Sequence, residues 1–292
     1  MKSFFKKYLP FARASFMDFI AYKTTIFIWL FIDVLSILLT VFVWTAVYNS
    51  HASSTGVDLY SVVLNGFTYK EIVSYNIIIF IFSFSVFGGG TSDTISNEIK
   101  DGTIAVQLIK PINYRNRFIF SSIGNLISAN LIIGIPLLSV SYIVLSVIGF
   151  IPFNGIFDLL CRLVILILFE IIACILNDSF NFIFGILAFY TNASFGLFQI
   201  KNAVQGFLSG TLIPMSFIAS SSILWIKGLG TILDYSPFVY MAQYPTYLVI
   251  GRITPLHALA SLGIAILWLF AFELIGRLAY AHATKKLIIQ GG

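Results

Sequence analysis

Long apolar stretches alternate with short polar ones along this chain, and within each stretch the apolar residues are continuous. A run of about 20 apolar residues is long enough for a helix to cross the hydrocarbon core of a bilayer. The pattern therefore predicts an all-α polytopic membrane protein and argues against a membrane β-barrel, whose strands alternate apolar and polar residues. Six transmembrane helices are expected, at residues 26–48, 61–88, 118–150, 157–190, 193–214 and 256–281.

Three of these spans raise questions about their limits. The second begins at Ser61 or at Ile72, and the neighbouring charges of residues 70–71 favour the later start. The third is too long for one upright helix, so we expect one tilted helix in which Pro136 permits a kink. The fourth ends either at residues 177–178 or at residues 190–192, and the pattern leaves both open.

Composition agrees with a membrane protein. Of the 292 residues, 59% are hydrophobic and only 10% are charged, and the mean hydropathy is +0.96. Soluble domains contain roughly 25% charged residues. The net charge of +5 is not the footprint of a nucleic-acid-binding protein, because the basic residues lie at the ends of apolar runs.

The basic residues also predict an orientation. Of the 17 Lys and Arg residues, only Lys70, Arg162, Lys227 and Arg252 fall on the outer side when both termini are placed in the cytosol. Cytosolic loops carry an excess of Lys and Arg, so this arrangement is favoured.

Two further segments differ from simple spans. Residues 1–25 mix basic and aromatic side chains, which predicts an interfacial amphipathic helix, with a disordered basic tail as the alternative. Residues 215–255 are divided by prolines into short apolar pieces, which predicts short re-entrant helices at the outer face. In the last span, Glu273 and Arg277 are spaced for a local i,i+4 ion pair.

Polar residues inside the spans are candidates for a translocation path or for a subunit interface. On the first span, Trp29, Asp33, Ser36, Thr40 and Trp44 form one helical stripe. A lipid-facing aspartate is costly, so the stripe is expected to face protein or a water-filled path, and both remain open. Further candidates on other spans are Asn76, Ser83, Gly206 and Gly210, the last two with the GxxxG spacing of close helix packing, and Glu170.

The main polar interruption of the apolar pattern is at residues 89–117. Thr91, Ser92 and Asp93 offer N-caps for a short helix that ends at residues 100–101. Gly102 is suited to the left-handed turn after that helix, and a second helical piece at 103–109 stops before Pro111.

This two-part element has an apolar face and a polar face. Ile95, Ile99, Ile104 and Leu108 are expected to pack on the membrane helices, whereas Glu98, Lys100 and Asp101 are available to a polar partner. The alternative is a merely solvated loop. The preceding glycines 88–90 are not followed by lysine at phosphate-loop spacing, so they do not indicate a nucleotide site.

A family resemblance rests on three groups of residues. The first is Glu98, Gly102-Thr103, Leu108 and Pro111; the second is Leu208-Ser209-Gly210 with Ile213-Pro214; the third is Pro237-Phe238, Pro245 and Gly251. In this order, and with six spans, the chain resembles the permeases of type 2 ATP-binding-cassette (ABC) exporters, in particular the small bacterial ones.

The resemblance implies a cytosolic coupling helix between spans 2 and 3 that sits in a groove of an ABC ATPase. The residues that it places at this contact are Ser92, Ile95, Glu98, Ile99, Lys100, Asp101, Gly102, Thr103 and Pro111. It also implies two copies of the ATPase, a second permease subunit that is the same or different, and the bacterial cell membrane as location.

No catalytic, metal or cofactor motif is found in the sequence, so this chain is not expected to be an enzyme, and ATP and Mg are expected on the partner ATPase. The expected function is export of a hydrophobic or amphipathic cargo such as a drug, peptide or lipid-like molecule. The alternatives are an ATP-independent transporter or channel, and a non-transporting immunity or sensing subunit. No nucleic-acid partner is expected.

Overall fold

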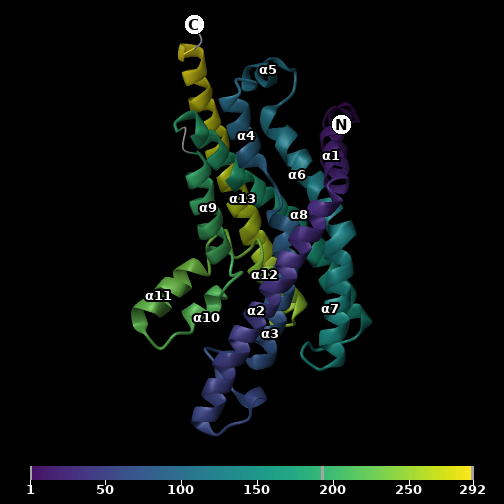
Figure 1. Cartoon of the computed structure of the whole chain (residues 1–292), viewed down its shortest axis with the longest axis vertical. Coiled ribbons are helices and arrows are strands. Elements are labelled where there is room, and N and C mark those ends of the chain that lie inside the picture. The colour runs from purple at the N-terminus through teal and green to yellow at the C-terminus, as the bar shows by residue number, and fades with distance from the viewer. Residues whose placement is uncertain (1, 192–193, 291–292) are drawn as a thin grey trace.

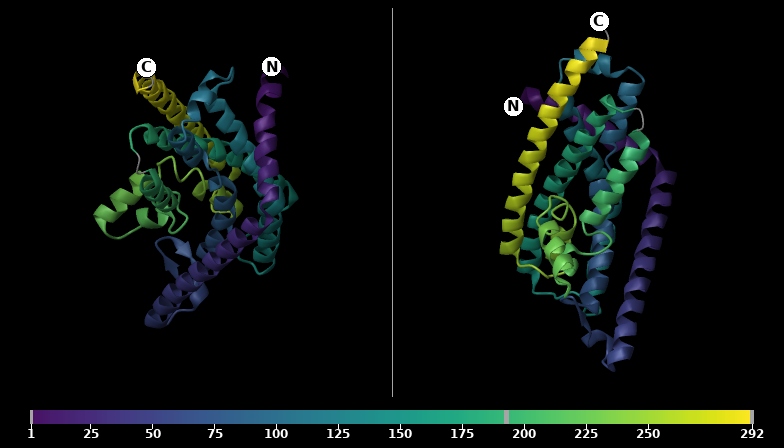
Figure 2. Two further views of the ribbon diagram at one scale, coloured as in Figure 1. Left: turned by 45° about the horizontal axis from the view of Figure 1, so that its top comes forward. Right: turned by 90° about the vertical axis from the view of Figure 1, so that its left-hand side faces the viewer.

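The computed structural model describes residues 2–191 and 194–290, which form an elongated bundle of helices (Figure 1). Both termini lie at one end of the bundle, and the two views of Figure 2 agree on this. We call this the inner end, following the expected orientation. The predicted start of the fifth span at residue 193 and the side chains of Lys2, Leu108 and Lys286 lie outside what the structure describes.

The N-terminal segment is a helix, α1 (Lys2–Ala21), packed along α6 (Tyr114–Ala129). Gly124 allows this close approach, since a Cβ atom there would lie 2.1 Å from the backbone oxygen of Ala12. The ring of Tyr8 stacks on Phe120 with centroids 5.5 Å apart. The helical prediction is therefore confirmed, and the disordered tail is excluded.

The first span, α2 (Lys23–Thr55), is longer than predicted. It continues beyond the predicted end at residue 48 and stops where Gly56 adopts φ 69°. A 3₁₀ turn (η1, Leu59–Ser61) and a two-stranded antiparallel hairpin of β1 (Val63–Leu64) and β2 (Phe67–Thr68) follow at the outer end.

The second span, α3 (Tyr69–Phe87), begins between the two predicted positions. The physical reason is a capping box: Thr68 accepts a hydrogen bond from the backbone of Glu71, whose carboxylate accepts one from the backbone of Thr68. Around α3 lies the largest apolar core, which includes Tyr48, Phe67 and Tyr75.

The polar interruption contains the two predicted helices, α4 (Thr91–Lys100) and α5 (Ile104–Ile109). Gly102 between them has φ 71°, as expected. The N-cap prediction is wrong, because Gly90 occupies that position and no side chain caps the helix. Thr91 and Ser92 are buried, because α4 continues towards the inner end and packs along α8 (Figure 1).

The third span is one continuous stretch from Tyr114 to Val147, as predicted. It is formed by α6, a π-helical turn (η2, Asn130–Gly134) and α7 (Ile135–Val147). The π turn ends two residues before Pro136, whose nitrogen has no hydrogen to donate to the preceding turn. The irregularity expected at Pro136 is thus present as one turn of π-helix between two α-helices.

The fourth span, α8 (Ile156–Ile186), continues into a 3₁₀ turn (η3, Leu187–Phe189), so the later of the two predicted ends is confirmed. The next helix, α9 (Ser194–Leu208), has only 15 residues. Gly206 has no atom near its Cβ position, and Gly210 lies beyond the helix with φ 81°. The two glycines therefore do not lie on one helix, and their place in a path or subunit interface stays a prediction.

The segment after α9 holds three short helices, α10 (Met215–Ala219), α11 (Leu224–Leu233) and α12 (Gln243–Val249). The last helix, α13 (Pro255–Gln290), runs 36 residues to the inner end. Among the described residues, five helical stretches are long and apolar enough to cross a membrane: Lys23–Thr55, Tyr69–Lys100, Tyr114–Val147, Ile156–Phe189 and Pro255–Lys285. The chain is thus a multi-pass helical membrane protein.

Candidate functional site

A cluster of buried polar side chains joins four helices in the inner half of the bundle. We call it the inner polar cluster; its members are Thr91 on α4, Arg115 and Ser122 on α6, Asp178 and Ser179 on α8, and Glu273 on α13. Three of these residues are ionisable and lie within long apolar helices, where a charge must be paired to be tolerated.

Arg115 is the centre of the inner polar cluster and is 7% exposed. Its guanidinium forms an ion pair with the carboxylate of Asp178 and donates to Glu273 at 2.6 Å through Nη2 and at 3.0 Å through Nε. Nη2 also donates to the hydroxyl of Ser179 at 2.9 Å. One cation therefore holds two carboxylates from two different helices, α8 and α13.

Asp178 connects this ion pair to α4. Its Oδ1 accepts hydrogen bonds from the hydroxyl of Thr91 at 2.5 Å and from that of Ser122 at 2.7 Å, while Oδ2 faces Arg115. The side chain of Asp178 is only 1% exposed. Each carboxylate oxygen thus has a donor, which is what a buried charge needs.

A second ion pair fixes the far end of α4. Arg117 on α6 donates to Glu98 at 2.7 Å, and the hydroxyl of Tyr114 donates to the other oxygen of Glu98 at 2.7 Å. The guanidinium of Arg117 lies over the ring of Phe118, 4.4 Å from its centroid. Within this chain α6 therefore provides a donor for each oxygen of Glu98, and its contact with a partner protein stays a prediction.

Polar contacts also attach α9 to α4 and α8. The ammonium group of Lys201 donates to the side-chain oxygen of Asn181 and, at 3.4 Å, to the hydroxyl of Ser92. One turn further, Gln205 donates to Asn177 at 2.6 Å.

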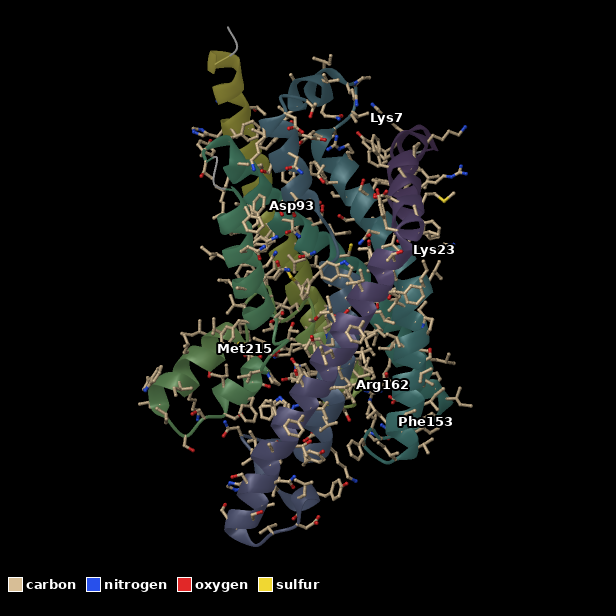
Figure 3. The ribbon with its side chains drawn as sticks, in the orientation of Figure 1. Lys7, Lys23, Asp93, Phe153, Arg162 and Met215 are labelled. Carbon is tan, nitrogen blue, oxygen red and sulfur yellow. The ribbon has the colours of Figure 1, made fainter. Side chains whose placement is uncertain are left out.

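The predicted partner-contact residues fall into two groups. Ser92 and Ile95 are buried against neighbouring helices. Ile95, Ile99 and Ile104 pack together in one apolar cluster, as predicted. The exposed ones are Lys100, Asp101, Gly102, Thr103 and Pro111. Figure 3 shows Asp93 of α4 in the inner half of the bundle, with Arg162 and Phe153 towards the outer end.

The predicted path residues do not converge on one surface. On α2, Trp29 is exposed and Asp33 half-buried, and the hydroxyls of Ser36 and Thr40 donate back to their own helix at 2.8 Å. On α3, Asn76 is buried and donates to the Ile72 carbonyl, and Ser83 lies 3.4 Å from the hydroxyl of Thr211. Gly210 accepts a hydrogen bond from Tyr75 at 2.7 Å.

Sequence reasoning missed the inner polar cluster. Glu273 was paired with Arg277 by spacing, and this is wrong because Glu273 turns to Arg115 on another helix. Residues 177–178 were treated as a possible end of a span rather than as its polar interior. One signal was available in the sequence. An ionisable residue inside a span needs a partner, and Asp178 and the basic residues 115 and 117 are residues of this kind.

These features define a class: a multi-pass helical membrane protein whose inner half is joined by buried ion pairs and whose second and third spans are linked by a two-helix element. A sequence profile of the ABC-2 family transporter proteins matches residues 34–291. The chain therefore belongs to the ABC-2 family of transporter membrane proteins. No curated protein and no solved structure matches it.

Proposed function

We propose that this chain is the permease subunit of an ATP-driven exporter in the bacterial cell membrane. Two ABC ATPase subunits bind ATP and Mg and hydrolyse the ATP, and a second permease subunit completes the transporter. The cargo is hydrophobic or amphipathic and leaves the cell. Family membership supports the permease role.

The proposal includes six crossings with both termini in the cytosol. Five long apolar stretches alone would leave the termini on opposite sides, yet N- and C-termini lie at one end of the bundle (Figure 1). The short helix α9 supplies the sixth crossing. Its 15 residues span about 22 Å, and residues 209–214 complete the distance to α10.

The ATPase contact is the exposed tip formed by the end of α4, the Gly102 turn and α5. Val106 and Ile109 on α5 are 54% and 82% exposed. Asp101 and Lys110 flank them. An apolar pair with charged neighbours is the composition of a protein-contact surface. The contact thus lies nearer α5 than the sequence predicted.

The single observation that supports coupling most directly is the inner polar cluster. A displacement of the tip moves α4. Asp178 joins α4 to α8, and Arg115 joins Asp178 to α6 and α13. Because these contacts are buried and charged, they resist local bending and pass the displacement to several spans together.

The test is to express the full-length chain with the ABC ATPase encoded beside it and to measure co-purification and ATPase activity. Val106→Asp with Ile109→Asp is expected to abolish association, because both changes place charge in an apolar contact. The matched control is Val57→Asp, at an exposed apolar residue of the outer end. Normal association of the tip variant contradicts the proposal, and transport by the permease without any ATPase favours an ATP-independent carrier.

A further inference from the structure

A cavity of about 210 Å³ lies between α7 and α8 in the outer half of the bundle. Leu138 and Tyr142 on α7 form part of its wall, together with Leu159 and Leu166 on α8 and Val249 on α12. Close-packed protein interiors contain few voids larger than a water molecule. An apolar cavity of roughly 150 Å³ already binds a small hydrocarbon, so this one has room for part of an apolar ligand.

The cavity follows from the irregular third span. Before the π turn η2, α6 packs along α8, whereas after it α7 packs along α3. The π turn and Pro136 lie between these two parts, and both are known causes of a bend in a helix. The third span therefore changes its neighbour at η2, and the outer parts of α7 and α8 enclose a space between them.

The cavity opens towards the surrounding membrane. Ile143 of α7 and Leu163 of α8 both line it, yet they are 60% and 41% exposed. Leu166 and Val249, at 5% and 7%, form its buried side. Apolar side chains that are exposed on a membrane-spanning helix face lipid. A lipid chain therefore reaches the cavity from the side of the bundle.

The depth of the cavity fits one leaflet of a bilayer. On α8 its lining residues lie between Leu159 and Leu166, about 5–15 Å along the helix from its start at Ile156. Phe153 belongs to the outer turn just before α8, and Arg162 lies inward of it (Figure 3). Half of the hydrocarbon core is about 15 Å thick. The cavity thus lies at the depth of the outer-leaflet acyl chains.

A small part of the cavity surface is polar, and Arg162, Ser139 and Tyr142 are the lining residues with polar side chains. Nε of Arg162 donates to Asp158 at 2.6 Å, and its Nη1 donates to the Leu248 carbonyl at 2.5 Å. Among the described residues, nothing accepts a hydrogen bond from its Nη2. An arginine with a donor to spare suits the oxygens of a phosphate group.

The side chain of Arg162 reaches towards the outer membrane surface. Side chains on a helix point towards its N-terminus, which for α8 is the outer end. The hydrogen bond to Asp158, one turn nearer that end, shows that Arg162 follows this rule. Its guanidinium is therefore closer to the headgroups than its own helical turn is, as in other arginines near the ends of spans.

We propose that this cavity binds one acyl chain of an outer-leaflet phospholipid, whose phosphate accepts a hydrogen bond from Nη2 of Arg162. The bound chain fills the space that the third span leaves beside α8, and it packs α7 against α8 where the protein itself does not. The inference goes beyond the proposed function and does not depend on it, because it requires only that the chain lies in a bilayer.

The experiment is photo-crosslinking of the purified full-length chain in nanodiscs that contain a phosphatidylglycerol with a diazirine in the upper half of one acyl chain. Peptide mass spectrometry identifies the labelled residues. We expect label on Val249, which is buried and lines the cavity. Ser139→Phe places a ring in the cavity and is expected to reduce this label at least fivefold. Val140→Phe, at the next and exposed residue of α7 outside the cavity, leaves the label unchanged.

The role of the phosphate is tested with a diacylglycerol that carries the same chains and the same diazirine. We expect at least fivefold less label on Val249 from this lipid than from phosphatidylglycerol. In Arg162→Gln, phosphatidylglycerol is expected to label Val249 only as strongly as diacylglycerol does. Labelling by diacylglycerol stays unchanged in this variant, which establishes that the cavity is intact.

Label confined to exposed residues such as Ile143 indicates ordinary boundary lipid and overturns the inference. Full labelling of Val249 in Ser139→Phe, or an equal loss in Val140→Phe, also overturns it, once gel filtration has established that both variants are folded. Equal labelling by the two lipids in the unaltered chain refutes the contact between Arg162 and phosphate. Because the ATPase is absent from this assay, its result and that of the association test at α5 are independent.

Discussion

Replacing Arg115 by methionine removes the cation that two buried carboxylates share. Methionine retains much of the apolar volume of the side chain but provides none of the donors to Asp178, Ser179 and Glu273. Removing one partner of a buried ion pair typically costs about 3–5 kcal/mol, because the remaining charge is left without compensation. We expect a loss of unfolding free energy of about this size.

Asp178→Asn provides the internal comparison. The amide oxygen still accepts from Thr91 and Ser122, and Arg115 retains Glu273, but an amide nitrogen replaces the oxygen that accepts from Arg115. Weakening the hydrogen bonds of one charged group lowers the free energy of unfolding by about 1.5–3 kcal/mol. We expect Arg115→Met to destabilise the protein more than Asp178→Asn does. The arginine change leaves two carboxylates without their cation, whereas the aspartate change leaves none.

The assay is reversible unfolding of the purified chain in mixed micelles with a rising fraction of sodium dodecyl sulfate, followed by circular dichroism. Arg13→Met is the control, since Arg13 is exposed on α1 and forms no ion pair among the described residues. If Arg115→Met and Arg13→Met cost the same, or if Asp178→Asn is the more severe change, the assignment of Arg115 as the centre of the cluster is refuted.

Two glycine replacements test close contacts, and a third tests a left-handed turn. Gly124→Ala places a Cβ 2.1 Å from the Ala12 oxygen and is expected to release α1 from α6, seen as faster hydrogen exchange in α1; Gly263→Ala, in open space, leaves exchange unchanged. Gly185→Ala, 2.8 Å from Ile95, is expected to separate α4 from α8 and lower stability in the same micelle assay; normal stability contradicts this. Gly102→Ala forces a left-handed alanine at a cost of about 1 kcal/mol and is expected to lower ATPase stimulation without lowering association.

The local signals at the polar interruption predicted its structure well. The helix at 91–100, the glycine turn and the second helix before Pro111 were all recognisable, because turn and stop signals act on the few residues beside them. The caps failed for a long-range reason. Thr91 lies inside the helix, because Gly90 occupies the N-cap, and its hydroxyl donates to the buried carboxylate of Asp178 on α8.

Pairing between helices was not predictable in the same way. Glu273 and Arg277 have favourable spacing, yet surface pairs of that kind are worth only a few tenths of a kcal/mol. Arg115 on α6 is a buried partner, and its ion pair with Glu273 is therefore much stronger. Sequence spacing describes neighbours on one helix, whereas the partner in a bundle depends on which helices pack together, and that information comes only with the fold.

The distribution of charge gives the proposed exporter a division of labour between its inner end and its centre. At the inner end, each carboxylate of Glu98, Asp178 and Glu273 has an arginine partner, so α4, α6, α8 and α13 move as one body when the tip is pushed. At the centre, Asp33 lies on α2, which is attached mainly along α3. A rigid inner body and a loosely held α2 concentrate the displacement at the seam between them. That seam runs between α2, α3 and the π turn η2, whose residues line one small apolar cavity there.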